Sequence, residues 1–321
     1  MQNILFIIDR LELKYFEFNQ LVTNFWLIKA LLEESSQVAV ATIDNLGIQN
    51  SKGVAKTQQV YLKDNNIFLK QEKNIKLIED FEMVLFRPDP PVDVDYINAT
   101  YVFDFVDCNK TIVLNSPSAI RNFNEKLHIT YFPEFSPQNI LSCDTEEIRN
   151  FLNIHKKAVV KPLNRCFGSG VFVLDENDIN LNTLIKTATN NGSNLVMVQE
   201  YLKSAPQGDK RIMILGEEVL EECIIKAPLQ NDFKFSTHND SCILKTTLNK
   251  EEKTAACAIA KKLNSLGLPL AGLDMLEGKV IEINITSPCY FIKEVNKFFD
   301  TNLEKRIVNF LRNRTKSQIL V

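Results

Sequence analysis

The chain has 321 residues, of which 45% are hydrophobic, and its formal net charge at pH 7 is −3. This length allows two or three packed units with apolar cores. The small acidic charge argues against nucleic acid or a membrane surface as a partner, and no stretch approaches the ~18 consecutive apolar residues that span a bilayer.

The chain contains seven scattered cysteines without a C-x-x-C pair, and three histidines that lie near no cysteine pair. An odd number of scattered cysteines is typical of reduced thiols. We therefore expect a cytoplasmic protein without a zinc site.

Residues 1–120 alternate short, β-rich apolar runs with helical patterns. The runs are NILFIID, QVAVATI, EMVLFR and TIVLN, and the main helical patterns cover 18–34 and 94–107. This alternation is typical of a parallel sheet with helices on its faces, so we expect an N-terminal α/β domain over 1–120.

Two local signals refine this domain. Arg87 ends one of the predicted strands and begins the loop RPDPPVD, at the carboxyl end where open α/β sheets usually bind ligands. Ser116 and Pro117 predict the N-cap and the first position of a helix.

From residue 121 the pattern changes to α+β. Strands are predicted at AVVKPL, GVFVL, LVMVQEYL, KRIMILG and VIEINIT, and helices near 178–190 and 250–265. The second helix is expected to end in the segment LGLP, because glycine and proline terminate helices.

The stretch GLDMLEGKVIEINITSP places polar side chains in an otherwise apolar strand. Glu282 and Asn284 share one face of this strand, while the neighbouring isoleucines share the other. A hairpin with a three-residue connection, 277–279, would place Asp274 opposite Glu282. Carboxylate and amide oxygens on one face suit Mg²⁺ bound together with a nucleotide. A solvated hairpin face is the alternative interpretation.

Positive side chains occur through both halves of the α+β part. Lys126 in NFNEKLH and Lys161 in VVKPL are flanked by apolar residues, and Arg211 in GDKR precedes the strand IMIL. Each lysine by itself is typical of a surface position. Together with the Asp, Glu and Asn side chains, however, these cations are the groups that phosphoryl chemistry on Mg-ATP requires.

At this point the chain resembles bacterial glutathione synthetase, a member of the ATP-grasp ligases. The segments that carry the resemblance are RPDPPVDVDYINATY, NEKL, VVKPL, QEYL, GDKRIMILGEEV and GLDMLEGKVIEINITSP, and their order covers almost the whole chain. The resemblance implies an N-terminal α/β substrate domain, 1–120, followed by two α+β lobes of an ATP-grasp fold, 121–200 and 201–321, that hold ATP between them.

The resemblance also implies a reaction. ATP would phosphorylate the cysteinyl carboxylate of γ-glutamylcysteine, and the amine of glycine would attack the acyl phosphate to give glutathione, ADP and phosphate. It implies small-molecule partners, Mg²⁺ or Mn²⁺ as the cofactor, and a homo-oligomer such as a homotetramer.

The resemblance implies roles for individual positions as well. Lys126 and Lys161 would bind phosphates, Asp209 would lie beside the ribose, and residues 199–202 would form the hinge that reads adenine. The implied ATP site comprises Lys126, Lys161, Gln199, Glu200, Tyr201, Leu202, Asp209 and Lys226.

The implied metal ligands are Asp274, Glu282 and Asn284. Arg211, with Lys161, would be catalytic, because preorganised positive charge stabilises an acyl phosphate and the tetrahedral intermediate. The implied substrate-binding residues are Arg87, Arg211, Thr286, Ser287 and Pro288.

Two loops depart from the family pattern. After the second lysine the family has a glycine-rich loop, because glycines let backbone N–H groups approach phosphates, whereas this chain has LNRCFGSGVF, with Arg165 and Phe167 at expected glycines. In the second mobile loop Lys226 replaces an arginine, and no glycine occurs from 217 to 266. The loops at 164–170 and 226–242 are therefore expected to cover the site differently.

Three functions remain open from the sequence. The first is an Mg-ATP-dependent glutathione synthetase. The second is an ATP-grasp carboxylate-amine ligase with a different peptide or acceptor, which the altered loops would permit. The third is a weakly active nucleotide- or peptide-binding relative, although the retained metal ligands argue against it.

Overall fold

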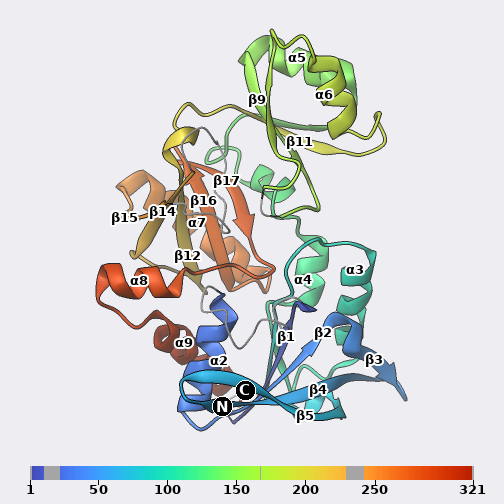
Figure 1. Ribbon diagram of the computed structural model, residues 1–321, viewed down its shortest axis with the longest axis vertical. Coiled ribbons are helices and arrows are strands. Elements are labelled where there is room, and N and C mark those ends of the chain that lie inside the picture. Colours follow the sequence, from blue (N-terminus) through green and yellow to red (C-terminus); the bar gives the residue numbers. More distant parts are fainter. Residues whose placement is uncertain (1, 11–21, 167, 229–241, 320–321) are drawn as a thin grey trace.

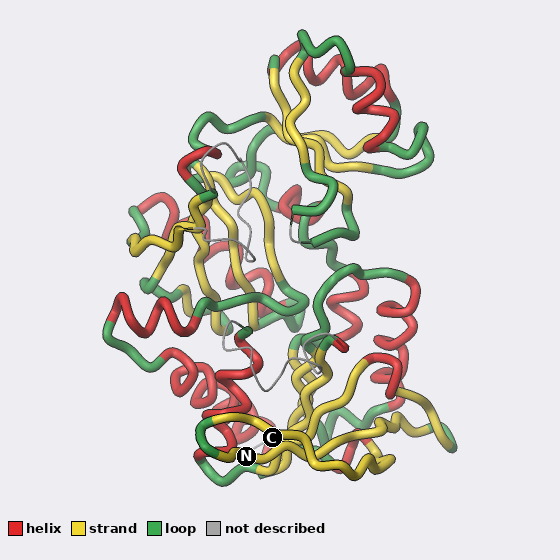
Figure 2. Tube along the Cα trace, viewed as in Figure 1, coloured by secondary structure: helices red, strands yellow, loops and turns green. Residues whose placement is uncertain are grey.

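The computed structural model describes residues 2–10, 22–166, 168–228 and 242–319. Within these ranges the strands form three separate sheets (Figure 1), of seven, four and six strands. Figure 2 shows helices packed beside each sheet, so that the chain builds three layered units.

The first sheet has the strand order β3-β4-β2-β1-β6-β7, with β5 paired to β4. The four predicted strands, β1, β2, β6 and β7, run parallel to one another. The strands of this sheet are β1 (Asn3–Ile8), β2 (Gln37–Thr42), β3 (Leu46–Gln49), β4 (Lys52–Lys63), β5 (Asn66–Leu77), β6 (Met83–Phe86) and β7 (Ile112–Leu114).

The α/β class is confirmed, but the sheet is mixed rather than parallel throughout. Strands β3, β4 and β5, which the sequence analysis did not predict, form an antiparallel extension. Asn50 with Ser51, and Asp64 with Asn65, have positive φ in the two connecting turns. Two such residues in succession allow the tight turn of a hairpin, so no crossover helix is needed here.

Three helices belong to this unit: α2 (Thr23–Glu33), α3 (Val94–Tyr101) and α4 (Pro117–Asn122). The start predicted at residue 18 for the first helix lies outside the described residues. The prediction for 94–107 is confirmed by α3 and the 3₁₀ turn Val102–Phe105 that follows it. Ser116 caps α4 by accepting a hydrogen bond from the Ala119 N–H, as predicted.

Strand β1 explains how the sheet is buried on both faces. Leu5 and Ile7 pack into a core with α3 and α4, whereas Ile4, Phe6 and Ile8 pack into a second core with α2. Alternate residues of a strand point to opposite faces, so an apolar run such as NILFIID fits a strand covered on both sides.

The second sheet is antiparallel, with the order β10-β9-β11-β8. Its helices, α5 and α6, lie together beside the sheet (Figure 1) and enclose a small separate core. The elements are β8 (Asn139–Ser142), α5 (Thr145–His155), β9 (Lys157–Pro162), β10 (Phe172–Asp175), α6 (Leu181–Ala188) and β11 (Val196–Glu200).

The third sheet has the order β15-β14-β12-β16-β17, with β13 paired to β12. Helix α7 begins with a capping box between Asn249 and Glu252 and ends before Gly267, which has a φ of 81°. The elements are β12 (Asp209–Leu215), β13 (Glu218–Val219), β14 (Cys223–Ala227), β15 (Cys242–Thr246), α7 (Lys250–Ser265), β16 (Leu270–Leu276), β17 (Lys279–Asn284), α8 (Ile292–Phe299) and α9 (Leu303–Ile319).

The hairpin of β16 and β17 reaches the predicted register by a different route. Asp274 lies opposite Glu282, as predicted, but the connection has two residues, Glu277 and Gly278, instead of three. A β-bulge at Ile281 supplies the extra residue, because two residues of the bulged strand then oppose one on its partner. The predicted three-residue connection is therefore wrong, although the resulting pairing is the predicted one.

The hydrophobic cores cross the boundaries between the sheets. Phe123, Ile129 and Phe132 pack in one cluster with apolar residues of the first and third sheets. Leu303 and Ile307 of α9 pack with α2 and the first sheet. The domain limits at residues 120 and 200 stay predictions, and the packing ties the two ends of the chain together.

Candidate active site

A cavity of about 300 Å³ lies where the second and third sheets meet the loop after β6. Most of the predicted site residues line it, although they come from segments far apart in the sequence. These residues are Lys126, Lys161, Gln199, Glu200, Leu202, Asp209, Arg211, Lys226, Asp274, Glu282, Asn284, Thr286 and Ser287. Arg87, Tyr201 and Pro288 are the predicted residues that do not line it.

Asp274 is the most heavily bonded acid of the cavity. Arg211 faces it across β12 and β16, with 2.6 Å from Nε to Oδ1 and 3.0 Å from Nη2 to Oδ2. Asn284 also donates to Oδ2, at 3.2 Å. Burial disfavours the carboxylate, but the charges of Arg211 and Lys226 outweigh burial and hold the pKa of Asp274 well below its usual value.

Gly272 makes room for this Arg211 geometry. A Cβ added at Gly272 would lie 3.2 Å from the Arg211 Cδ, closer than ordinary van der Waals contact. The absence of a side chain therefore lets the arginine lie across β16 and reach both Asp274 and the Cys289 carbonyl, to which its Nη1 donates at 2.9 Å.

Lys226 bridges two carboxylates. Its Nζ lies 2.6 Å from Asp209 Oδ2 and 2.9 Å from Asp274 Oδ1. Lys226 therefore connects Asp209 with Asp274, one of the predicted metal ligands. Burial nevertheless raises the pKa of Asp209, because Lys226 compensates only part of the lost hydration and Asp274 adds a second negative charge.

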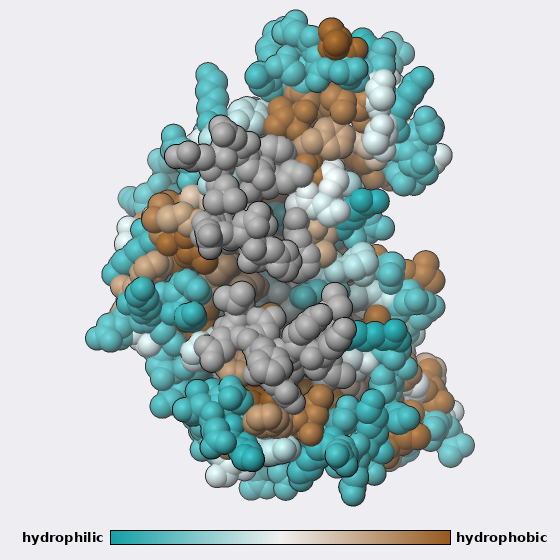
Figure 3. Space-filling view, viewed as in Figure 1, coloured by the Kyte–Doolittle hydropathy of each residue, from teal (hydrophilic) through white to brown (hydrophobic). Residues whose placement is uncertain are grey.

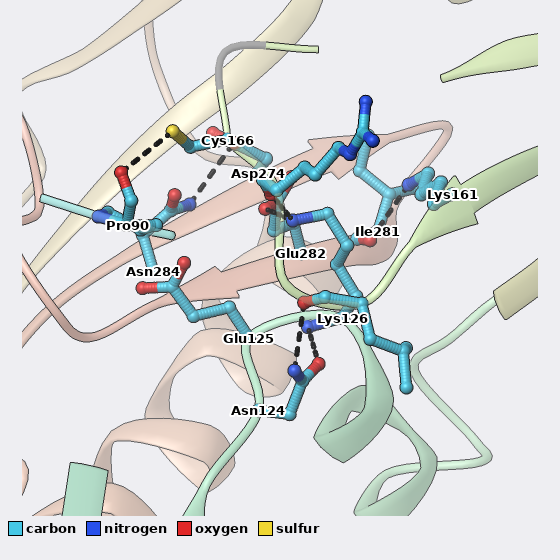
Figure 4. Close-up of polar contacts among 12 residues, drawn as sticks. Pro90, Asn124, Glu125, Lys126, Lys161, Cys166, Asp274, Ile281, Glu282 and Asn284 are labelled. Carbon is cyan, nitrogen blue, oxygen red and sulfur yellow. Dashed lines mark hydrogen bonds and ion pairs between the residues drawn. The ribbon is translucent and has the colours of Figure 1, made fainter. Parts of the chain in front are cut away.

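Lys126 connects Glu282 with the loop after β9 (Figure 4). Its Nζ lies 3.0 Å from Glu282 Oε1 and donates to the Arg165 carbonyl at 2.6 Å. Burial opposes the charge on Glu282, but Lys126 and then Lys161 lower its pKa. The exposed Arg165 side chain is not part of the cavity lining, so the loop contributes its backbone here.

The bulge at Ile281 joins the second and third sheets. Lys161 on β9 donates to the Ile281 carbonyl at 3.1 Å, and Gln199 on β11 donates to the same oxygen at 3.4 Å. Ile281 also lines the cavity, so the alternation expected for the isoleucines is wrong at this one position. Burial lowers the pKa of Lys161 to about 8.

The predicted adenine hinge, residues 199–202, follows the end of β11. The N–H groups of Glu200 and Tyr201 donate to the carbonyls of Gln138 and Lys157. Donors for a bound base would therefore have to come from further along, beginning with the N–H of Leu202.

Glu125 clamps the segment after β17. Its Oε1 accepts from the N–H groups of Ile285 and Thr286, at 2.7 and 3.0 Å, and from the Thr286 hydroxyl at 3.0 Å. Burial raises the pKa of Glu125, and the nearby charge of Glu282 adds to this effect. Glu125 was not among the predicted site residues, although it is the acid of the NEKL motif.

Arg87 contacts the predicted substrate-binding turn but does not line the cavity. Only 1% of its surface is exposed, and it donates to Asn24 Oδ1 at 2.6 Å and to the Pro288 carbonyl at 2.9 Å. In this structure it therefore holds the turn in place rather than lining the cavity. A direct contact with substrate stays a prediction.

Asp89, which the sequence analysis also missed, brings the loop after β6 into the cavity wall. Burial raises its pKa to about 6, while a hydrogen bond with Ser287 acts in the opposite direction. In the same loop the Pro90 carbonyl accepts from the Cys166 thiol at 3.2 Å (Figure 4). The available signal for Asp89 is its position in the loop RPDPPVD, two residues after Arg87.

The thiols in the cavity wall are not activated. Burial raises the pKa of Cys166 to about 11 and also raises that of Cys289. Both thiols are therefore protonated at neutral pH, and a protonated thiol is a poor nucleophile. None of the seven cysteines, all of which lie in the described part of the chain, forms a disulfide.

The donors of the hairpin fit a cation that arrives with a nucleotide. Among the residues that the structure describes, no group of three or more His, Cys, Asp and Glu side chains could hold a metal. Asp274, Glu282 and Asn284 offer two carboxylates and one amide in the same cavity wall. Mg²⁺ usually takes one or two carboxylates plus substrate phosphates, so this donor set suits it.

The altered loops are described only in part. Gly168 and Gly170 have φ values of 67° and 72°, a backbone conformation that glycine adopts without strain. Phe167 and residues 229–241, for which altered loop structure was predicted, lie outside the described residues.

The polarity of the surface and of the helices bears on whether the chain could contact or cross a membrane. On the face seen in Figure 3, hydrophilic residues are widespread and apolar residues gather in separate patches. The helices in the described part of the chain are too short or too polar to cross a membrane.

Comparison with protein families assigns almost the whole chain. Residues 3–121 match the model of the prokaryotic glutathione synthetase N-terminal domain, and residues 125–300 match that of the prokaryotic glutathione synthetase ATP-grasp domain. The glutathione synthetase of Vibrio parahaemolyticus is 31% identical over 298 residues, which cover 92% of this chain and 94% of the relative. That of Gloeobacter violaceus is 31% identical over 320 residues, covering 98% and 97%.

Solved structures similar to this one confirm the ATP-grasp fold. D-cycloserine synthetase DcsG superimposes with a TM-score of 0.68 at 15% identity, covering 97% of this chain and 99% of that one. D-alanyl-alanine synthetase A from Vibrio cholerae gives 0.62 at 10% identity, with 98% and 99% covered. The ATP-grasp ligase PsnB, solved with a precursor variant, Mg and ADP, gives 0.60 at 15% identity, with 98% and 99% covered.

Proposed function

Because the chain belongs to the prokaryotic glutathione synthetase family, we propose that this ATP-dependent ligase joins γ-glutamylcysteine to glycine and releases ADP and phosphate. The observation that carries the proposal is the convergence of three lysines, Arg211 and the Asp274–Glu282–Asn284 face on one cavity. Such a set neutralises phosphates and holds their metal, which are the main requirements of phosphoryl transfer.

The cations of the cavity already have anionic or carbonyl partners. Lys126 contacts Glu282, while Arg211 and Lys226 contact Asp274. Nucleotide phosphates would draw Lys126 and Lys226 away from the carboxylates, and Asp274 and Glu282 would then be available to Mg²⁺. When bound, Mg²⁺ supplies positive charge to the phosphate oxygens. Metal and nucleotide are therefore expected to bind together.

Arg211 has the chemistry to stabilise the acyl phosphate. Its guanidinium is planar, stays charged and presents several donors in a fixed plane. The pairing with Asp274 and the Cys289 carbonyl fixes its orientation before substrate arrives. Preorganised charge of this kind is effective because no reorganisation is needed as the negative charge develops.

A second candidate keeps the ligase chemistry but changes the peptide or the acceptor. Lys226, where the family resemblance implies an arginine, binds Asp209 and Asp274 as a single point charge. An arginine would offer a planar fork at the same place, so substrate contacts on this side would differ. A weakly active, binding-only relative is the third candidate.

The deciding experiment is phosphate release by the purified protein with Mg-ATP, γ-glutamylcysteine and glycine. Each component is omitted in turn, and the product is identified by mass. Release that needs both the peptide and glycine, with glutathione as the product, supports the proposal. Release that needs the peptide but not glycine favours another acceptor, and ATP binding without release favours the binding-only relative.

The resemblance also supports a cytoplasmic homo-oligomer, which we include in the proposal. Light scattering of the purified chain at several concentrations would measure its mass. A monomer at every concentration would contradict this part.

A further inference from the structure

The acidic side chains of the cavity differ in their partners. Asp274 and Asp209 contact Lys226, and Glu282 contacts Lys126. Glu125 uses one oxygen for three hydrogen bonds to the segment after β17. Asp89, by contrast, forms no ion pair with any described residue, and the Ser287 hydroxyl is its hydrogen-bond partner.

The surroundings of Asp89 explain its protonation behaviour. Burial raises its pKa to about 6, and the negative charges of Asp9 and Glu125 add to this, whereas Ser287 and Arg87 act in the opposite direction. Asp9 follows β1, and Glu125 lies just before the 3₁₀ turn Leu127–Tyr131. Ser287 lies in the turn after β17, and Arg87 directly follows β6. The negative charge of Asp89 also raises the pKa of the Cys166 thiol.

The proposed reaction needs a proton acceptor. Two cavity acids with raised pKa values are already engaged, since Asp209 is paired with Lys226 and Glu125 holds the segment after β17. At neutral pH the amino group of the acceptor substrate, glycine, is protonated. The nitrogen of this ammonium group has no lone pair with which to attack the acyl phosphate. Lys126, Lys161 and Arg211 use their N–H groups as donors in the cavity. Asp274 and Glu282 are proposed for the metal, and their pKa values are lowered, so they are poor bases.

We propose that Asp89 is a catalytic residue that binds the ammonium group of the acceptor and removes one of its protons. The inference rests on the proposed function. The neutral amine then attacks the carbonyl carbon of the acyl phosphate, forming the C–N bond, and phosphate leaves with the electron pair of the broken C–O bond. A second proton passes from nitrogen to the departing phosphate, so the products are the amide, hydrogen phosphate and protonated Asp89.

The position of Asp89 agrees with this role. Asp89 lines the same cavity as Arg211 and Ser287, so an acyl phosphate held by Arg211 and an amine held by Asp89 would share that cavity. A base whose pKa lies just below neutrality is largely ionised at pH 7 and still accepts a proton, which is the range in which general bases are most effective.

The first test compares glycine with hydroxylamine as the acceptor in Asp89→Asn. Hydroxylamine is largely unprotonated at neutral pH and needs no base, so hydroxamate formation should stay close to the wild-type rate. With glycine, kcat/KM should fall by about 10²-fold or more. The matched control is Asp95→Asn, an exposed aspartate on α3 that lies outside the cavity.

The second test is the pH profile. With glycine, wild-type kcat/KM should fall as the pH drops through about 6, because Asp89 becomes protonated there, and this acid limb should be missing from Asp89→Asn. In Ser287→Ala the limb should move to higher pH, because the hydrogen bond that lowers the pKa is lost.

Protein stability provides a check on folding that does not depend on activity. The folded pKa of Asp89 lies above its value in an unfolded chain, so its ionisation makes stability fall as the pH rises through the interval from about 4 to 6. Asp89→Asn removes that loss and should be at least as stable as wild type at pH 7.

Three outcomes would overturn the inference. Unchanged turnover of glycine by Asp89→Asn, or an equal loss with both acceptors, would exclude a base at this position. Failure of the wild-type protein to make any product with glycine would instead overturn the proposed function, and this inference with it. The hydroxylamine reaction of the wild-type protein would then still report whether the acyl phosphate forms.

Discussion

At the scale of single residues, the candidate site is a set of buried charges that neutralise one another. Asp274, Arg211 and Lys226 are each less than a tenth exposed, and all are in contact through the Asp274 carboxylate. Removing one partner of such a group leaves an uncompensated buried charge, which costs about 3–5 kcal/mol. Each buried charge of this group is therefore held in place by its partners.

Glu282→Gln tests the predicted metal site. The neutral amide keeps the shape of the side chain but removes a charge that Mg²⁺ needs, so most turnover should be lost while peptide binding is largely retained. Mn²⁺ binding in the presence of a nucleotide should weaken as well, measured by titration. The control is Glu277→Gln in the exposed turn of the same hairpin, and full activity of Glu282→Gln would refute the metal assignment.

At the scale of elements, the hairpin of β16 and β17 depends on supports from outside its own sheet. The bulge at Ile281 gives its carbonyl to Lys161 and Gln199 of the second sheet. Glu125 holds the segment that follows β17, and its own carbonyl accepts from the Ile283 N–H at 2.9 Å. The metal face is therefore positioned from both sides of the cavity.

Two substitutions of Glu125 distinguish its role as a hydrogen-bond acceptor from its role as a negative charge. Glu125→Ala leaves two N–H groups and a hydroxyl buried without an acceptor, so unfolding in urea should show a loss of about 1–3 kcal/mol or more. It should also raise the Mg²⁺ concentration needed for half-maximal activity. Glu125→Gln keeps an acceptor oxygen, so its free energy of unfolding and its Mg²⁺ requirement should both lie close to those of the wild type.

Glu134→Ala, at an exposed position before β8, is the matched control for this clamp. If Glu125→Ala unfolded at the same urea concentration as this control, the hydrogen bonds to Ile285 and Thr286 would contribute nothing to stability.

At the scale of the whole molecule, the first and last segments of the chain share one core. Leu303, Ile307 and Leu311 of α9 are fully or almost fully buried among residues of α2 and the first sheet. The same cluster includes Ile224 and Leu270 of the third sheet. Strand β6, which precedes the loop that carries Asp89, is thus packed into a core shared with the third sheet, and Arg87 joins the start of this loop to the turn after β17.

Ile307→Ala tests whether this shared core makes the first and third sheets one cooperative unit. The side chain is fully buried, and its truncation should cost about 2–5 kcal/mol in free energy of unfolding. Fluorescence of Trp26, the one tryptophan of the chain, and loss of nucleotide binding should follow a single transition. Two separate transitions would contradict the shared core.

The same truncation at Ile179 serves as the control. Its side chain is 97% exposed, so Ile179→Ala should leave the unfolding transition almost unchanged.

The sequence alone indicated many of the elements, the fold class and the family. Apolar runs with short periods predicted β1, β2, β6 and β7, and the mixture of Glu282 and Asn284 with isoleucines identified the polar face of β17, because local pattern controls which face of a strand is apolar. The quoted motifs were specific enough to indicate the family, and they lie within the segments that line the cavity.

Only the tertiary structure decided which groups act on one another. The bulge at Ile281, the burial of Arg87 behind the cavity and the clamp by Glu125 depend on contacts between residues more than 60 positions apart. Asp89 shows the same limit, because an acid in a proline-rich loop has a raised pKa only once packing removes its water and no ion pair with a described residue compensates for the loss. Residue type follows from sequence, whereas burial and partnership arise only when distant segments meet.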